Sequence, residues 1–561
     1  MKQKSKTLLL KSFLILLILS LGTYLRTINL NWDQGHHLHP DERFLTMVGN
    51  KIKWPQNIRE YFNTDLSPLS PYNQDYGFFV YGTLPLFLVK RLAILLKKDN
   101  YDQFNLLGRQ ISAILDLGTL ILIGFIAKRI IKKHWPWAFF IYAISVLPIQ
   151  LAHFFAVDTF LNFFLTATFL SLIIFYQKSS KIFLASAGVL LGMALACKIT
   201  AALFTPIAEL FIIMNSFKKK NWQSFFINEA ILAIFLFFSF RFFQPYAFTN
   251  IGHINLQFIT NLKENQKLIN IPNHFFPPAI QWLKTTPILF PVKNIILWGL
   301  GLPLGIITFI AIIFSPLIRE KKQQLNFPLW INWFWITLLI VIQGSQYNKT
   351  MRYFLIIYPS LAIITGNFVG ILLEKIKSQK TKLLVTILTV TIFLVWPLSF
   401  IKIYSQPHSR VIASEWIYKN IPQRVTISCE HWDDCLPLPI ENKNSIAYHY
   451  KIERLQLYDA DTNKKWQKIN QQLDQVDYLI LSSNRLWGSI PKVPDIYPQT
   501  AQFYQDLFAN RLNWRKIAEF TSYPGFPPLG KSWFFFPDQN ADEAFTVYDH
   551  PKVIIFEKTV Q

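Results

Sequence analysis

Two adjacent carboxylates follow the first long apolar run of the chain. They are Asp41 and Glu42, in the segment WDQGHHLHPDERF. Carboxylates near a bilayer surface are poorly solvated, which raises their pKa and makes them better proton acceptors. A solvated acidic loop would contain the same residues, so both interpretations stay open at this point. On the first interpretation, the pair supplies a general base.

Further charged residues stand at the ends of apolar blocks. Asp158 is either a site residue or the N-cap of the next helix. Lys198 interrupts a long apolar stretch, as a snorkelling or a ligand-binding lysine would. An anionic ligand would explain Lys349 and Arg352, and the planar guanidinium of Arg352 matches phosphate better. Arg109 opens another apolar block and could join this set.

A carboxylate with several cations at membrane depth suits transfer from a lipid phosphate. The carboxylate would take the proton of an acceptor hydroxyl, and the cations would stabilise the departing phosphate. The chain has no P-loop and no large cytoplasmic domain for a nucleotide sugar, so a sugar donor would have to arrive on a lipid. No cofactor is implied with certainty. A divalent metal stays open because His36, His37 and His39 precede Asp41, although their spacing matches no defined site.

The composition is typical of a membrane protein. The 561 residues are 52% hydrophobic and 16% charged, and the apolar residues come in long blocks. The net charge of +23 could suggest nucleic acid. Its basic residues, however, form short clusters between apolar blocks, which is the pattern of cytoplasmic loops. These clusters lie at 128–133, 218–220, 319–322 and 375–382.

Apolar blocks predict about eleven membrane spans. They lie at 8–28, 107–127, 136–152, 159–176, 182–197, 201–216, 225–243, 294–317, 329–343, 353–373 and 382–401. The segment 78–96 is also apolar, but Lys90 and Arg91 interrupt it, and two cations at mid-bilayer would cost roughly 5–7 kcal/mol. If 78–96 lies along the outer surface instead, all four basic clusters fall on the cytoplasmic side.

This topology predicts a multi-pass protein of the inner (plasma) membrane with a cytoplasmic N-terminus and an extracytoplasmic C-terminal domain. The first external loop would cover 29–106. We divide the chain into a membrane domain, 1–404, and a C-terminal α/β domain, 405–561, whose segments RVTIS, VDYLILSS and KVIIF are typical of strands. A disulfide between Cys429 and Cys435 stays open, and Cys197 is interpreted as packing.

Several segments, in this order, resemble the GT-C glycosyltransferases. They are HPDERF, YGTLPLFLVKR, GRQIS, HFFAVD, CKITA, QPYAF, MRYFLIIYP and the C-terminal DEAFTVYDHPKVIIFEK. The similar branch contains protein O-mannosyltransferases, the bacterial aminoarabinose transferase and bacterial phospholipid carrier-dependent glycosyltransferases. The C-terminal domain is unlike the β-trefoil domain of eukaryotic mannosyltransferases.

The resemblance implies an inverting transfer from a polyprenyl-phosphate sugar to an extracytoplasmic protein, glycan or lipid. Asp41 matches the proposed base of the family, Glu42 completes the pair, and Asp158 matches an acidic residue at the start of the fourth span. Lys198 and Arg352 match positions that face the lipid phosphate. Lys349, Arg109 and Tyr353 complete the expected donor-binding set.

Two other functions would use many spans or a large external domain. A transporter or lipid flippase would place charges near the middle of the bilayer and show two related halves. A structural anchor for the C-terminal domain would not need about eleven spans. The candidate residues are expected at one surface and no two-half pattern is evident, which favours the transferase.

Overall fold

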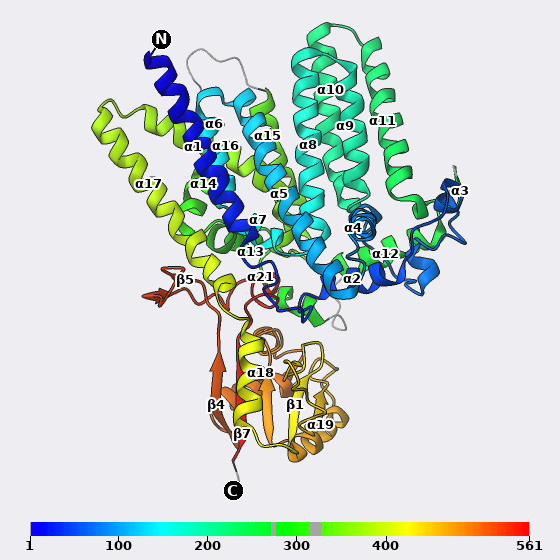
Figure 1. Ribbon diagram of the computed structural model, residues 1–561, viewed down its shortest axis with the longest axis vertical. Helices are drawn as coiled ribbons and strands as arrows, with labels where there is room; N and C mark the ends of the chain where they lie inside the picture. Colours follow the sequence, from blue (N-terminus) through cyan, green and yellow to red (C-terminus); the bar gives the residue numbers. More distant parts are fainter. Residues whose placement is uncertain (1, 251, 271–276, 315, 317–326, 560–561) are drawn as a thin grey trace.

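The protein folds into a helical bundle with a sheet-containing domain at one end. The computed structural model describes residues 2–250, 252–270, 277–314, 316 and 327–559. Figure 1 shows the long helices packed side by side and the C-terminal domain projecting from one end of them. The expected fold class, a bundle of apolar helices followed by an α/β domain, is confirmed.

Among the described residues, seven helices are long and apolar enough to cross a membrane. They are α5 (Tyr101–Ile130), α8 (Val157–Lys178), α10 (Thr205–Lys219) with η3 (Ile199–Phe204), α11 (Gln223–Phe243), α15 (Phe327–Ser345), α16 (Tyr358–Glu374) with η7 (Met351–Ile357), and α17 (Gln379–Phe400) with its continuation. A bent pair adds an eighth span: α6 (Trp135–Ile144), preceded by η2 (Lys132–His134), meets α7 (Val146–Ala152) at 52°.

Three of the eleven predicted spans coincide with shorter apolar helices. The span at 8–28 falls on α1 (Lys2–Thr27) and that at 182–197 on α9 (Lys181–Leu195). Glycines let α9 pack tightly, because a Cβ at Gly192 would lie 2.6 Å from a backbone oxygen of α11. The span predicted at 294–317 is broken at Gly301, whose φ of +84° interrupts the helix between η6 (Ile295–Gly299) and α14 (Leu302–Phe314).

The segment predicted to lie on the surface forms α4 (Thr83–Leu95). Figure 1 shows α4 end-on while the long helices run along the page, so α4 crosses the bundle direction. Its Lys90 pairs with Asp99 at 2.8 Å, and Arg91 lies 5.1 Å above the ring of Trp54. The position of α4 at a membrane surface stays a prediction.

Three of the four basic clusters, at 128–133, 218–220 and 375–382, gather at the end of the bundle that holds the N-terminus. Figure 1 shows the N-terminus, the α10–α11 connection and the start of α17 at this end, opposite the C-terminal domain. Lys133, in the cluster 128–133, pairs with Glu374 at 2.6 Å. Glu374 directly precedes the cluster 375–382, so this ion pair brings the two clusters together. The cluster 319–322 lies outside the described residues. Which side of the membrane this end faces stays a prediction.

The C-terminal domain is built on a five-stranded sheet in the order β2-β1-β3-β7-β4. The strands are β1 (Thr426–Glu430), β2 (Lys451–Leu455), β3 (Tyr478–Leu481), β4 (Trp514–Phe520) and β7 (Val553–Lys558). β2, β1 and β3 are parallel, whereas β7 and β4 are antiparallel. The helices are α18 (Ser409–Asn420), α19 (Asn463–Gln475) and α20 (Pro498–Phe508). The three predicted strands are thus present. The predicted domain boundary at 404/405 falls within η8 (Ile401–Ser405) and stays a prediction.

The other described elements fall outside the long bundle helices and the five-stranded sheet. They are α2 (Pro40–Lys51), α3 (Ile58–Phe62), η1 (Pro71–Gln74), η4 (Pro245–Ala247), α12 (Leu256–Asn270), η5 (Pro277–Trp282), α13 (Leu289–Asn294), η9 (Ile490–Lys492), α21 (Glu543–Thr546) and the pair β5 (Gly525–Phe526) and β6 (Phe534–Phe535). Cys429 and Cys435 form a disulfide, and Cys197 is buried as expected.

Candidate active site

The acidic pair opens α2, where local sequence rules favour a helix start. Pro40 occupies the first turn, His39 caps the helix by accepting from the backbone N–H of Glu42, and both carboxylates lie at the positive end of the helix dipole. Successive residues of a helix point about 100° apart. Asp41 and Glu42 therefore face different surroundings.

Asp41 points toward the cation expected to bind phosphate. Its Oδ2 lies 2.5 Å from Nη2 of Arg352, at the start of η7, and Tyr81 donates a hydrogen bond to it. Burial opposes ionisation, but the charges of Arg352 and His39 and these hydrogen bonds outweigh it and lower the pKa of Asp41 to about 2. The expectation of a raised pKa is thus wrong for Asp41, because its nearest neighbour is a guanidinium.

Three further predicted residues meet at the same point. Asp158 opens α8 and lies 3.8 Å from Nε of Arg352 and 2.9 Å from Nζ of Lys198. The Lys198 ammonium lies 3.9 Å from the ring centroid of Tyr353. We call Asp41, Asp158, Lys198, Arg352 and Tyr353 the charged cluster. Its four charges are two positive and two negative. A cavity of only about 10 Å³ lies beside Asp158, Lys198, Arg352 and Tyr353, so these side chains leave little free space between them.

Glu42 and Arg109 form a separate buried network. The two N–H groups of Arg109 donate to Glu42 at 2.9 and 2.6 Å, and Arg109 also pairs with Asp33 at 2.8 Å. Phe155 donates its backbone N–H to Glu42 at 2.5 Å. Because these partners occupy both side chains, Glu42 and Arg109 tie α2 to α5 and to the start of α8. The lowered pKa of Asp33 has the same origin, since the charge of Arg109 outweighs burial.

Lys349 and the histidines lie outside the charged cluster. The Lys349 ammonium donates to the carbonyl of Tyr347 at 3.2 Å. His37 pairs with Asp102 at 3.0 Å, while His39 packs between the rings of Phe154 and Tyr548. Within the described residues, no three His, Cys, Asp or Glu side chains are grouped so as to hold a metal. The residues considered for a divalent ion are therefore not brought together.

Comparison with known proteins gives one partial family match and several structures of similar fold. Residues 103–241, from α5 to α11, match the family model of dolichyl-phosphate-mannose-protein mannosyltransferases. The chain is similar in structure to the Archaeoglobus fulgidus oligosaccharyltransferase tethered with an acceptor peptide, with a TM-score of 0.52, 11% identity, and 97% and 88% of the two chains covered. The complex of that protein with Zn and sulfate gives 0.51 at the same identity and coverage. The family match covers part of the chain, and the solved structures share its fold.

One more solved structure is similar at a lower score. It is ArnT from Cupriavidus metallidurans bound to undecaprenyl phosphate, with a TM-score of 0.44, 11% identity and 97% of each of the two chains covered. Among curated protein sequences, none matches this chain. The family match covers the spans that carry Asp158 and Lys198, which are two members of the charged cluster.

One residue that supports the cluster was not singled out from the sequence. Asp542, in the C-terminal domain, accepts hydrogen bonds from Thr350 Oγ1 at 3.1 Å and from the backbone N–H of Met351 at 3.0 Å. Both donors directly precede Arg352, so the C-terminal domain holds the start of η7. The signal was present in the motif DEAFTVYDH, which the sequence analysis used only as part of a resemblance.

The same motif anchors the domain to the bundle. His550 lies 2.8 Å from Asp538 and 2.5 Å from Asp549, and Asp549 also accepts from Gln150 in α7 and Tyr404 in η8. Burial by itself would lower the pKa of His550, but the charges of the two aspartates outweigh it and raise the pKa to about 10. The protonated imidazole therefore links two carboxylates at this junction.

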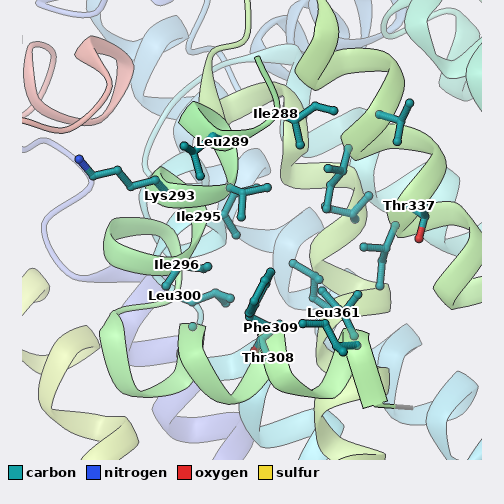
Figure 2. Close-up of a pocket in the computed structure, with 18 of the residues that line it drawn as sticks. Ile288, Leu289, Lys293, Ile295, Ile296, Leu300, Thr308, Phe309, Thr337 and Leu361 are labelled. Atoms are coloured by element: carbon teal, nitrogen blue, oxygen red, sulfur yellow. The ribbon is translucent and has the colours of Figure 1, made fainter. Parts of the chain in front are cut away.

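An apolar cavity of about 810 Å³ lies beside η7. Figure 2 shows its walls, with Ile288, Leu289, Ile295, Phe309 and other apolar side chains turned toward one another while Lys293 extends away from them. Helices α13, α14, α15 and the start of α16 supply most of the lining. Ile357, the last residue of η7, is one of the lining residues, so one short helix carries both Arg352 and part of the cavity wall.

Proposed function

We propose that the protein is a membrane glycosyltransferase that moves a sugar from a polyprenyl-phosphate donor to a hydroxyl group of an extracytoplasmic acceptor, with inversion at the sugar carbon. The observation that carries the proposal is the ion pair between Asp41 and Arg352, which joins a proton acceptor to a phosphate-binding cation. The acceptor oxygen attacks the anomeric carbon from the side opposite the phosphate. The sugar–phosphate C–O bond breaks, and its electron pair leaves with the phosphate.

Asp41 takes the acceptor proton, and Arg352 and Lys198 stabilise the departing phosphate. A phosphate cannot enter a cavity of about 10 Å³ unless these side chains move. We infer that the donor phosphate draws Arg352 away from Asp41. The pKa of Asp41 then rises, because burial acts with less opposition, and the carboxylate becomes a stronger base once the donor is bound.

The remaining predicted residues receive supporting roles in this scheme. Asp158 orients Lys198 and Arg352, and the Tyr353 ring supports the Lys198 ammonium. Glu42 and Arg109 hold α2 so that Asp41 faces the cluster. Lys349 stays a predicted donor contact, reached only if the loop before η7 shifts.

The apolar cavity is the proposed place of the isoprenoid chain. An extended apolar chain is stabilised by burial against the aliphatic lining, at roughly 25 cal/mol per Å². η7 is a 3-10 helix, so its Arg352 and Ile357 are separated by about 10 Å along the axis at about 2 Å per residue. One donor could thus place its phosphate at Arg352 and its chain in the cavity.

Two features support an extracytoplasmic site in the plasma membrane. The basic clusters lie at the opposite end of the bundle, as cytoplasmic loops would. The Cys429–Cys435 disulfide belongs to the C-terminal domain, and disulfides persist mainly in oxidising compartments.

The decisive experiment compares Asp41→Asn with Asp102→Asn, an exposed carboxylate in the first turn of α5. Purified protein is incubated with polyprenyl-phosphate sugars and candidate acceptors, and products are identified by mass spectrometry. Asp41→Asn should abolish transfer while the protein elutes and melts as the parent does, and Asp102→Asn should remain active. Full activity of Asp41→Asn would remove Asp41 as the base.

A further inference from the structure

A second, polar cavity of about 410 Å³ lies in the C-terminal domain. It is found at the carboxyl ends of the three parallel strands. Glu430 ends β1, Arg454 lies at the end of β2, and Arg485 follows β3, and all three line the cavity. In sheets of this kind ligands bind outside the carboxyl ends of the strands, where connections leave in opposite directions. The order β2-β1-β3 has this reversal at β1.

The loop after β1 forms one wall and is held in a strained shape. The Cys429–Cys435 disulfide closes it, and Asp433 and Asp434 bind Arg410 of α18 at 2.5 and 2.7 Å. Trp432 has φ of +80°, a conformation that costs a bulky residue about 1–3 kcal/mol. Its side chain is nevertheless 44% exposed at the cavity. The disulfide and the ion pairs thus hold a large aromatic side chain at a solvent-facing wall.

The cavity borders the charged cluster. Asp434 pairs with Arg43, two residues after Asp41, at 2.7 Å. Leu38, Pro40 and Tyr548 form the nearest end of the lining. The Tyr548 ring packs against His39, with the ring centroids 4.3 Å apart, and lies within electrostatic range of Asp41 and Arg352. A molecule in the cavity can therefore extend a group toward Asp41.

We propose that this cavity binds a saccharide, and that the saccharide carries the acceptor hydroxyl. The assignment of the saccharide as acceptor rests on the proposed transferase function. Both carboxylates and arginines line the cavity, so an anion would meet Asp433 and Asp434, and a cation would meet four arginines. An uncharged polyhydroxyl ring suits such a lining, since each hydroxyl both donates and accepts. The volume lies in the usual range for small-ligand sites, about 300–1,000 Å³.

Glu430 gives independent support. Its side chain is 1% exposed, its Oε1 accepts from Tyr504 at 2.5 Å, and among the described residues its Oε2 has no hydrogen-bond partner. Burial raises the pKa of Glu430 to about 8, so at neutral pH the carboxyl is largely protonated and can both donate and accept. A buried polar atom of this kind gains a partner when a ligand hydroxyl enters.

A peptide fits this place less well. An extended peptide would add to a free sheet edge, but β1, which carries Glu430 and the closed loop, is paired on both sides by β2 and β3. When the saccharide occupies the cavity, its hydroxyl loses a proton to Asp41 and gains a bond to the donor sugar, while the phosphate departs with the bonding electrons.

The test measures binding of free sugars to the full-length protein in lipid nanodiscs by saturation-transfer NMR. The probes are methyl α-mannopyranoside, methyl β-glucopyranoside and N-acetylglucosamine. We expect a signal for at least one probe. Trp432→Ala and Arg454→Gln, both exposed positions, should each weaken binding about tenfold. The matched variants Trp533→Ala and Arg515→Gln, on exposed side chains elsewhere in this domain, should bind as the parent does.

The result separates this inference from the transferase function. Arg352→Ala should bind the sugars normally, because it alters only the donor side. Absence of binding in the parent protein, or binding insensitive to Trp432→Ala, would overturn the saccharide site. A signal from a serine- and threonine-containing decapeptide that depends on Trp432, with none from the sugars, would also overturn it. Sugar binding in a protein whose Asp41→Asn variant keeps full transfer would leave the site standing and refute only the base.

Discussion

Replacing Arg352 by Gln should raise the pKa of Asp41 by at least about two units. In the parent protein Asp41 titrates at about 2 rather than at its ordinary value of 3.8. The difference corresponds to about 2–3 kcal/mol of preference for the ionised carboxylate, at about 1.4 kcal/mol per unit. Burial is the largest influence on Asp41 and acts to raise its pKa, while Arg352 is the largest opposing one. Without Arg352, the pKa should rise above 3.8.

Infrared difference spectroscopy measures this shift directly. Spectra are recorded for the Arg352→Gln variant and for the double variant that also carries Asp41→Asn. Subtracting the second set from the first isolates the C=O stretch of protonated Asp41 as the pH is lowered. The band should appear above pH 4 in this pair and stay undetectable at that pH in the pair that retains Arg352. Arg511→Gln, which removes an exposed arginine paired with Asp506, is the matched control. Equal titration of Asp41 with and without Arg352 would refute the coupling between base and phosphate site.

Three further predictions concern residues around the charged cluster. The pKa of His550 is raised from 6.5 to about 10 on folding. The contribution of His550 to stability is therefore complete below pH 6.5 and is lost as the pH rises through about 10. Thermal unfolding in detergent should show this decline in stability, and the His550→Gln variant should lack it. Asp542→Ala should raise the donor KM more than it changes the acceptor KM, because it frees the backbone before Arg352, and equal effects on both would contradict a positioning role. Arg109→Met leaves two buried carboxylates unpaired and should destabilise the protein by about 3–5 kcal/mol in denaturant titrations, against about 0–1 kcal/mol for Arg515→Met at an exposed pair.

The local features of this protein followed from its residues. Apolar blocks predicted helices at all eleven places, because the free energy of burying backbone polar groups in lipid leaves little besides a helix. Lys90 and Arg91 led to the prediction that α4 is not a span, since their charge conflicts with an apolar core. Among the described helices, α4 is not one of those long and apolar enough to cross a membrane, and its position at a membrane surface stays a prediction. The strands at 426–430, 478–481 and 553–558 were evident from their β-branched and aliphatic content. The break at Gly301 was not predicted, because the block around it is apolar throughout.

The sequence also supplied the members of the charged cluster, but only the tertiary structure decided their partners. Asp41 and Glu42 are neighbours in sequence, yet the turn of α2 directs one to Arg352 and the other to Arg109. The pKa of Asp41 is lowered because its partner is Arg352. The general rule for carboxylates near membranes predicted a raised pKa, because the rule does not consider a cation some 300 residues away in the sequence. Asp542 and the polar cavity depend on the docking of the C-terminal domain against η7 and α2, a long-range arrangement that no local pattern encodes.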